Sequence, residues 1–370
     1  MANGNQIIQL FEEFAPKHLA VEGDKIGLQI GTLNKEVRRV MVTLDVLESV
    51  VDEAIAREVD LIIAHHPPIF SPLGQVNDRS AAGRITMKCI RHDISVYVAH
   101  TNLDVCKGGV NDWMSEALGL EGTEVLVPTY EEPVYKLSVF VPTTHQEVVS
   151  EALGKAGAGH LGDYADCQFS VTGTGQFTPL DGTSPFIGRP HETERVEEVK
   201  IETIVRESQK KRVLRAMHEA HPYEEVAYDL IRDEIEGQVL GLGRIGRLSS
   251  PMSLEAFALH VKKSFGVEGV RVVGELDRRI EKVAVLGGDG NKYVSKAAFK
   301  GADAYVTGDL YFHVAHDAMA LGMAVVDPGH HVESVMKQGV VDVLAEKFEK
   351  AKIDVDLIVS EANTNPFQFR

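Results

Sequence analysis

Histidine and carboxylate residues follow three apolar segments of the chain, and these residues are the ones most able to carry out chemistry. They are His65 and His66 after residues 61–64, His100 and Asp104 after residues 95–99, and His330, His331 and Glu333 after residues 323–326. In open α/β sheets, binding sites form at the carboxyl ends of the strands. If these three strand ends converge, their imidazole and carboxylate groups form a metal site with mixed nitrogen and oxygen ligands.

The chemistry of this ligand set limits the metal. Imidazole and carboxylate ligands without thiolates suit Zn²⁺, Mn²⁺, Fe²⁺ or Co²⁺. Two histidines from one loop, together with two carboxylates that can bridge, suggest two ions per chain, which in such sites lie roughly 3.5–4 Å apart. We therefore expect two divalent ions, with zinc first and manganese, iron or cobalt as alternatives.

Each group of residues also has an ordinary structural explanation. His65 and His66 fit a solvated loop, Asp104 fits a cap for the helix that follows, and Glu333 fits a residue that favours a helix dipole. His330 and Glu333 are three residues apart, so one helical turn places both on the same face. Three such groups at equivalent strand ends favour a metal site over three separate coincidences.

Further residues sit at predicted strand ends and are expected to line the pocket: Asp45, residues 287–290, Asp309 and His313. Glycine-rich turns after strands can hold anions. Residues 241–246 match the letters GxGxxG, but no long apolar strand precedes them, and Pro251 follows where a helix should open. We therefore reject a dinucleotide-binding fingerprint.

Apolar strands alternate with amphipathic helices towards both ends of the chain. The predicted strands are residues 37–44, 59–64, 95–99, 282–286, 304–307, 323–326 and 353–359. The predicted helices are residues 4–15, 47–57, 80–92, 109–118, 253–265, 291–300 and 313–321, with one more after Gly329. This order is typical of a largely parallel α/β sheet that is covered on both faces.

The middle of the chain follows a different pattern. Predicted strands at residues 134–141, 196–205 and 226–231 are combined with helices at residues 146–156 and 207–220 and with a hairpin region at residues 165–178. The order βα, ββ, αβ is the ferredoxin-like pattern. We predict a discontinuous α/β core made of residues 1–129 and 238–370, with an inserted ferredoxin-like α+β domain at residues 130–237.

The composition excludes several classes of protein. The chain has 38 basic and 55 acidic residues, and its net charge of −17 disfavours binding to extended nucleic acid. A single nucleotide in a pocket stays compatible, because bound cations reverse the local potential. Three scattered cysteines, the lack of an apolar run of about 20 residues and the lack of a signal-peptide pattern predict a cytoplasmic protein without disulfides or membrane contact.

The sequence resembles the family of dinuclear-metal-centre proteins related to the yeast NGG-interacting factor three, which are often labelled GTP cyclohydrolase I type 2 homologues. The matching segments stand in family order and are residues 27–31, 64–67, 99–104, 306–309, 329–333 and 363–367. Many relatives have a tryptophan before the first segment, whereas this chain has Glu-Gly-Asp-Lys at residues 22–25. The insert resembles that of the longer, YqfO-type members. Its Glu202 and residues 221–229 are similar to small trimeric domains of the P-II and copper-tolerance kind.

The resemblance implies five metal ligands: His65, His66, Asp104, His330 and Glu333. Many relatives place the last glutamate four residues after its histidine, so His331 is the alternative to His330. We prefer His330 because it directly follows Gly329 and faces the turn. The resemblance also implies a toroidal homohexamer that is built as a trimer of dimers.

Two functions are compatible with these features. The first is a dinuclear-metal-dependent hydrolase that acts on a nucleotide-type substrate such as GTP, with a metal-activated water as the nucleophile and Glu333 or His100 moving protons. The second is a metal-binding regulatory or scaffold protein whose insert senses a small ligand or a partner. Metal-dependent turnover distinguishes the first function from the second.

Overall fold

The computed structural model describes residues 2–370, which form two compact units. The first unit combines the chain up to residue 130 with residues 240–370, and the second unit is residues 131–239. Among the described residues, no helix has the length and apolar character needed to cross a membrane.

The first unit contains a five-stranded sheet in the order β17-β4-β5-β6-β2. Its strands are β2 (Gly27–Ile30), β4 (Arg39–Thr43), β5 (Leu61–Ala64), β6 (Ser95–Val98) and β17 (Asp356–Val359). Strands β17, β4, β5 and β6 are parallel, and β2 is antiparallel at the edge. All four residues of β5 and all four of β6 are buried, which is typical of parallel strands covered on both faces.

Helices cover this sheet and position its loops. They are α1 (Gly4–Glu12), α2 (Glu48–Ala56), α3 (Ala81–Arg91), α4 (Thr101–Val105) and α5 (Val110–Ala117). Helix α3 begins after Ser80, whose hydroxyl accepts a hydrogen bond from the Gly83 amide at 3.0 Å. A two-stranded pair, β1 (Ala2–Asn3) and β3 (Glu36–Val37), and a 3-10 turn at Lys17–Leu19 complete this part of the unit.

A second sheet of the first unit has six strands in the order β13-β16-β15-β14-β12-β7. They are β7 (Leu120–Glu131), β12 (Val239–Ser253), β13 (Arg271–Val273), β14 (Arg279–Asp289), β15 (Ala304–Gly308) and β16 (Ala324–Asp327). Strands β14, β15 and β16 are parallel, whereas β12 and β13 pair in the antiparallel sense. The core is therefore mixed α/β with several sheets, parallel at the centre and antiparallel at the margins, rather than one largely parallel sheet.

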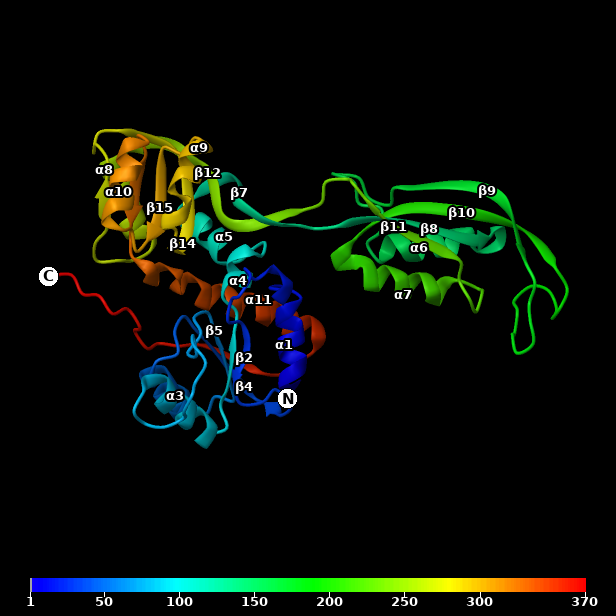
Figure 1. Cartoon of the computed structure of the whole chain (residues 1–370), viewed down its shortest axis with the longest axis horizontal. Coiled ribbons are helices and arrows are strands. Elements are labelled where there is room, and N and C mark those ends of the chain that lie inside the picture. Colours follow the sequence, from blue (N-terminus) through cyan, green and yellow to red (C-terminus); the bar gives the residue numbers. More distant parts are fainter. Residues whose placement is uncertain (1) are drawn as a thin grey trace. The chain divides into compact units, whose positions relative to one another are not determined.

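The remaining helices of this unit are α8 (Leu254–Ser264), α9 (Val294–Phe299), α10 (Phe312–Ala320) and α11 (Met336–Ala351). Helix α11 contacts β17, β4 and α5, while α5 contacts β14. These two helices therefore lie between the two sheets, as Figure 1 shows for α11. One continuous hydrophobic cluster includes Val40 and Leu61 of the first sheet and Val283 and Val306 of the second. This shared core holds the strand ends of both sheets close to one another.

The second unit has its own sheet and its own hydrophobic cluster. Its elements are β8 (Val134–Pro142), α6 (Gln146–Lys155), β9 (Gln168–Phe177), β10 (Glu194–Arg206), α7 (Lys210–Ala220) and β11 (Tyr228–Asp233), which can be followed in Figure 1. The sheet is antiparallel in the order β11-β8-β10-β9. The segment predicted as a hairpin region is one strand, β9, whose hairpin partner is β10. Its core packs residues such as Leu137, Val139 and Ile201 against Val149 and Met217.

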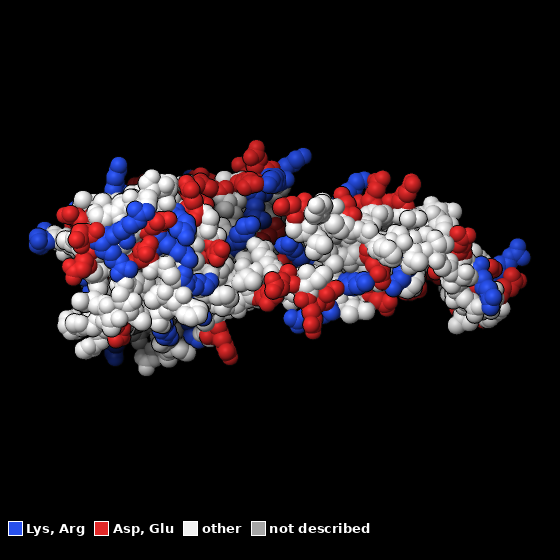
Figure 2. Space-filling model, turned by 90° about the horizontal axis from the view of Figure 1, so that it is seen from above, with Lys and Arg blue, Asp and Glu red and all other residues white. Residues whose placement is uncertain are grey.

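Acidic and basic side chains are intermingled on the face drawn in Figure 2. The excess of acidic residues is thus spread over this face and does not form one continuous acidic surface there.

Candidate metal centre

Three strand ends of the first unit deliver the predicted histidines and carboxylates. His65 and His66 follow β5, and their amides continue the ladder by donating to the carbonyls of Thr43 and Leu44 at 3.2 and 2.8 Å. His100 and Asp104 follow β6, where α4 begins at once. His330 and Glu333 follow β16 through Gly329, whose φ of 86° favours glycine.

The spacing of His330 and Glu333 is explained by a 3-10 helix, His330–Val335, that precedes α11. Side chains three residues apart eclipse one another in a 3-10 helix. The two side chains therefore meet, with His330 Nε2 at 3.1 Å from Glu333 Oε2. Two glycines of β14 permit this approach, because a Cβ on Gly287 would lie 2.7 Å, and one on Gly288 3.0 Å, from Glu333 Oε1.

Four histidines are each held from outside through Nδ1, so that their Nε2 atoms face the inner side. The Nδ1 partners are Ala99 O for His65 at 2.9 Å, Asp45 Oδ1 for His66 at 2.7 Å, Asp24 Oδ1 for His100 at 2.8 Å and Asp309 Oδ2 for His330 at 2.7 Å. Metal-binding histidines usually donate their second ring N–H to such a carbonyl or carboxylate, which fixes the tautomer and the ring orientation.

The inner nitrogens gather around the Glu333 carboxylate. Glu333 Oε2 lies 3.2 Å from His66 Nε2 and 3.9 Å from His65 Nε2. Within the described residues, three groups bring their ligand atoms within 4.8 Å of one another: His65 with His66 and His100, His66 with His330 and Glu333, and His65 with Asp104 and Glu333. We call these six residues the candidate metal centre. Each of the three groups could hold a metal ion, and the groups have residues in common.

Two atoms of the candidate metal centre are buried without a hydrogen-bond partner. These are His65 Nε2 and Asp104 Oδ1, which lie 3.6 Å apart. Because the Ala99 carbonyl can only accept, the ring proton of His65 sits on Nδ1 and a lone pair on Nε2 faces the carboxylate. Two buried acceptors facing each other are costly unless a cation or a proton lies between them. This observation shows that the residues fit a metal ion.

Charge and burial in the candidate metal centre perturb its ionisation. Burial lowers the pKa of His65 to about 3, which keeps its imidazole neutral and able to bind a metal. For Asp104, burial and the nearby Glu333 charge raise the pKa of the carboxyl group. Glu333 is also buried, but hydrogen bonds from His330 and His66 lower its pKa well below the usual range.

Two of the remaining histidines, His330 and His66, are stabilised in their charged form by Glu333. The hydrogen bond with Glu333 raises the pKa of His330 to about 9. Burial opposes the charge on His66, but its hydrogen bonds with Asp45 and Glu333 raise its pKa to about 10. Positive charge is thus favoured next to Glu333. Protons on these histidines balance the Glu333 charge, as a bound cation would do in their place.

A cavity of about 450 Å³ opens beside this centre. Its wall includes His66 and His330, and His331 lines the cavity while belonging to none of the three groups of the described residues. The segment Thr364–Phe367 forms another wall, and the Thr364 hydroxyl donates to Asp45 Oδ2 at 2.5 Å. This tail is thus connected through Asp45 to the ring of His66.

The residues predicted to line the pocket have different positions. Asp45 and Asp309 hold histidines, and residues 287–288 pack against Glu333. His313 lies exposed on α10 and belongs to none of the three groups of the described chain. The GxGxxG letters lie within strand β12 rather than in a strand-to-helix turn.

The role of Asp24 has no signal in the sequence. This residue holds His100 through Oδ1 and accepts the Thr101 amide at 2.9 Å through Oδ2. Burial opposes its charge, but these hydrogen bonds keep the pKa of Asp24 well below the usual range. Asp24 lies 76 residues before His100, and no local pattern joins the two.

Comparison with known proteins places these residues in a family context. The model of the family Duf34/NIF3 (NGG1p interacting factor 3) matches residues 2–366. A Bacillus subtilis (strain 168) protein named "GTP cyclohydrolase 1 type 2 homolog" is 60% identical over 367 residues, covering 99% of this chain and 98% of that protein. A protein of the same name from Listeria innocua is 44% identical over 370 residues, with 100% and 99% coverage.

Solved structures agree with the sequence comparison. The crystal structure of a Bacillus cereus protein related to NIF3 has a TM-score of 0.95 and 58% sequence identity, covering 100% of this chain and 99% of that chain. The Staphylococcus aureus protein SA1388 has a TM-score of 0.76 and 32% identity, with 100% and 99% coverage.

Proposed function

The chain belongs to the Duf34/NIF3 family, and on that premise we propose that it is a dinuclear-metal-dependent hydrolase acting on a nucleotide-type substrate. The observation that carries this proposal is the buried, unpartnered pair formed by His65 Nε2 and Asp104 Oδ1. Relatives named GTP cyclohydrolase 1 type 2 homolog support the choice of substrate class.

Two overlapping sets of residues would hold the ions. His65, Asp104 and Glu333 would hold one, and His66, His330 and Glu333 the other, with Glu333 shared by both. The ligands are imidazoles and carboxylates, and Zn²⁺ is our first choice, with Mn²⁺, Fe²⁺ or Co²⁺ as alternatives. When bound, such ions supply Lewis-acid charge that lowers the pKa of water towards neutrality and stabilises negative charge on the substrate.

We assign proton transfer to His100 rather than to Glu333. Glu333 is engaged by His66 and His330, and its lowered pKa makes it a weak base. The His100 ring is held by Asp24 through Nδ1, and although burial opposes its charge, Asp24 raises its pKa. The imidazole can therefore accept a proton at Nε2 while Asp24 stabilises the positive charge that results.

The substrate would enter the cavity beside His330 and His331. Its volume of about 450 Å³ is within the range of small-molecule sites. Phe367 is 67% exposed and offers a ring on which a base can stack. The lining also contains Asp45 and Asp309, which repel phosphate, so we expect nucleotide binding to require the ions.

The test is hydrolysis of a nucleotide panel by the full chain, with metal loaded and with metal stripped. We expect turnover with metal only, and a loss of about 100-fold or more in Asp104→Asn. Exposed Asp277, changed to Asn, is the matched control and should retain full activity. Equal turnover by the stripped protein, or by Asp104→Asn, would disprove the proposal.

A regulatory or scaffold role is the second candidate, and the cavity in the second unit favours it. In that case the ions would be structural or sensed, and the second unit would bind a small ligand. We propose that this unit is a ferredoxin-like domain of the P-II and copper-tolerance kind, a proposal supported by its βαββαβ order and its sheet order. Saturable ligand binding without nucleotide turnover would favour this role.

The homohexameric toroid implied by the family resemblance is also part of the proposal. Light scattering of the purified full chain should give six times the chain mass of 40.5 kDa. A monomer or dimer at working concentration would contradict it.

A further inference from the structure

A cavity of about 410 Å³ in the second unit is lined by rings and acidic residues. The lining includes the rings of Phe140, Phe177, Phe186 and Tyr223 and the carboxylates of Glu198, Glu224 and Glu225. The volume lies in the range of small-molecule sites. We propose that this aromatic cavity binds a small organic cation in which a short alkyl chain joins an ammonium group to a flat apolar ring.

The rings of the aromatic cavity are arranged around Tyr223. Its ring centroid lies 5.7 Å from that of Phe177 and 6.3 Å from that of Phe186, with interplanar angles of 62° and 51°. Tyr223 itself is positioned by His221, which accepts the Tyr223 amide at Nδ1 and donates to the Phe140 carbonyl from Nε2. Tilted rings of this kind present π faces to which a cation is attracted.

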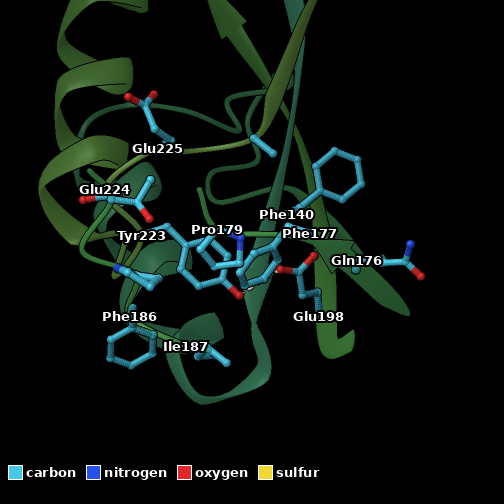
Figure 3. Close-up of a pocket in the computed structure, with 14 residues that line it drawn as sticks. Phe140, Gln176, Phe177, Pro179, Phe186, Ile187, Glu198, Tyr223, Glu224 and Glu225 are labelled. Carbon is cyan, nitrogen blue, oxygen red and sulfur yellow. Dashed lines mark hydrogen bonds between the residues drawn. The ribbon is translucent and has the colours of Figure 1, made fainter. Parts of the chain in front are cut away.

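One carboxylate is buried within this wall. Glu198 is 8% exposed, and the Tyr223 hydroxyl donates to its Oε1 at 3.0 Å, as Figure 3 shows. Within residues 2–370, no other hydrogen bond reaches the Glu198 carboxylate, so Oε2 is available to a donor on a ligand. The carboxylate occupies space left by Gly175, because a Cβ there would lie 2.1 Å from Oε2.

The charges of the aromatic cavity select a cation over an anion. Glu198, Glu224 and Glu225 are its charged lining residues in the described chain, and neither lysine nor arginine joins them. Glu224 accepts the Ser184 amide at 3.0 Å and so fixes the loop that closes the cavity, while the Glu225 carboxyl group points away from the rings in Figure 3. A buried acid surrounded by rings favours an ammonium group and repels phosphate.

A lysine outside the cavity does not change this balance. The Lys200 ammonium lies 6.0 Å from the centroid of the Phe140 ring and 2.6 Å from Glu202, which neutralises its charge. The ring of Phe140 thus already has a cation as a neighbour, in a pair that is compensated.

Three probes with similar rings and different head groups test the proposal: phenethylamine, 2-phenylethanol and 3-phenylpropanoate. Each is titrated into the full chain with labelled tyrosine and phenylalanine rings, and ring shifts are followed by NMR to about 10 mM, where weak cation–π binding is still detected. We expect saturable shifts of Tyr223 and Phe177 with phenethylamine, at least about tenfold weaker binding of the alcohol, and none of the carboxylate. Equal or tighter binding of 3-phenylpropanoate, or no saturation with phenethylamine, would overturn the proposal.

Two variants separate charge from shape. Glu198→Gln keeps an acceptor for Tyr223. We expect it to weaken the binding of phenethylamine about tenfold and to leave the binding of 2-phenylethanol unchanged. Gly175→Ala keeps the charge of Glu198 but displaces its carboxylate, and it should also weaken the binding of phenethylamine. Glu197→Gln is the matched control, because this exposed neighbour points to the opposite side of β10. An unchanged amine affinity in Glu198→Gln, or an equal loss in Glu197→Gln, would contradict the assignment.

Discussion

The candidate metal centre and the aromatic cavity show two opposite ways to build a site. The candidate metal centre gathers four imidazoles and two carboxylates at the ends of short strands, and each imidazole is oriented by a second group. The aromatic cavity gathers rings between long antiparallel strands and a loop, and it buries a single acid, Glu198, among them. The residues of the first site could hold metal ions, whereas the second site fits the proposed organic ammonium group.

The difference lies in what each site leaves unpaired. The candidate metal centre contains buried polar atoms with no partner, which is costly in a protein without a bound cation. In the aromatic cavity, the buried acid already has a hydrogen-bond partner in Tyr223. We therefore expect the ions to contribute to folding stability, whereas a ligand of the second unit should contribute little.

The largest expected effect comes from Glu333, which is shared by two groups of ligands. Changing Glu333→Gln keeps the size of the side chain but removes the charge that faces His66 and His330. We expect metal affinity to fall by about 1000-fold or more, which equals about 4 kcal/mol. Metal content after dialysis and competition with a chelating dye measure the loss. The control is Glu349→Gln, an exposed position on α11, and metal retention by Glu333→Gln would contradict the shared role.

Removing the metal should separate the two units by their stability. An ion present at a hundredfold excess over its dissociation constant stabilises the folded state by about 2.7 kcal/mol. Chelation should thus accelerate hydrogen–deuterium exchange in β5 and β6, whose ends carry ligands, and leave β8 and β10 unchanged. Exchange followed by mass spectrometry, with and without added metal, resolves the units. Equal acceleration in both would show that the sites are not energetically distinct.

A smaller effect is expected from the groups that hold the histidines. Asp309→Asn retains an acceptor for His330 Nδ1 but removes the charge that fixes the ring. We expect metal affinity to fall about tenfold, or 1.4 kcal/mol, because outer partners orient ligands without binding the metal. The matched variant Asp317→Asn, exposed on α10, should have no effect. A loss as large as that of Glu333→Gln would mean that Asp309 itself is a ligand.

The sequence predicted the candidate metal centre better than the aromatic cavity, for a physical reason. Strands β5, β6 and β16 are buried on both faces, so each appears as an apolar run that ends abruptly at a polar group. The ends of these three strands could therefore be predicted without knowing which strands pair beside them. The three-residue spacing of His330 and Glu333 was also readable, although a 3-10 helix rather than an α-helix explains it.

Other elements had no comparable local signal. Strand β7 contains Gly122, Pro128 and exposed acidic residues, and it is a strand because β12 pairs beside it. Asp24 and its partner His100 are distant in sequence, as are Glu198 and Tyr223. Tertiary contacts bring these pairs together, and a local pattern cannot report them.

The smallest expected effect tests how the aromatic cavity is held, through the pH dependence of the second unit. Burial lowers the pKa of His221. The nearby Glu198 charge opposes this shift, and the charges of His145 and His218 add to it. The unfolded chain therefore binds a proton first, near pH 6.5, and the stability that His221 contributes is present above this pH and is lost as the pH falls. At pH 5.5 the loss should stay below about 1.4 kcal/mol.

Urea unfolding of the full chain at pH 7.5 and 5.5, followed by methyl NMR signals of Leu137 and Val139, measures this loss. His221→Gln cannot titrate and should show a smaller decrease in stability between the two pH values, whereas exposed His160→Gln should behave like the natural chain. Because His221 holds Tyr223 in the aromatic cavity, the same acidification should weaken phenethylamine in the natural chain more than in His221→Gln. An identical pH dependence in His221→Gln and His160→Gln would show that His221 does not support the aromatic cavity.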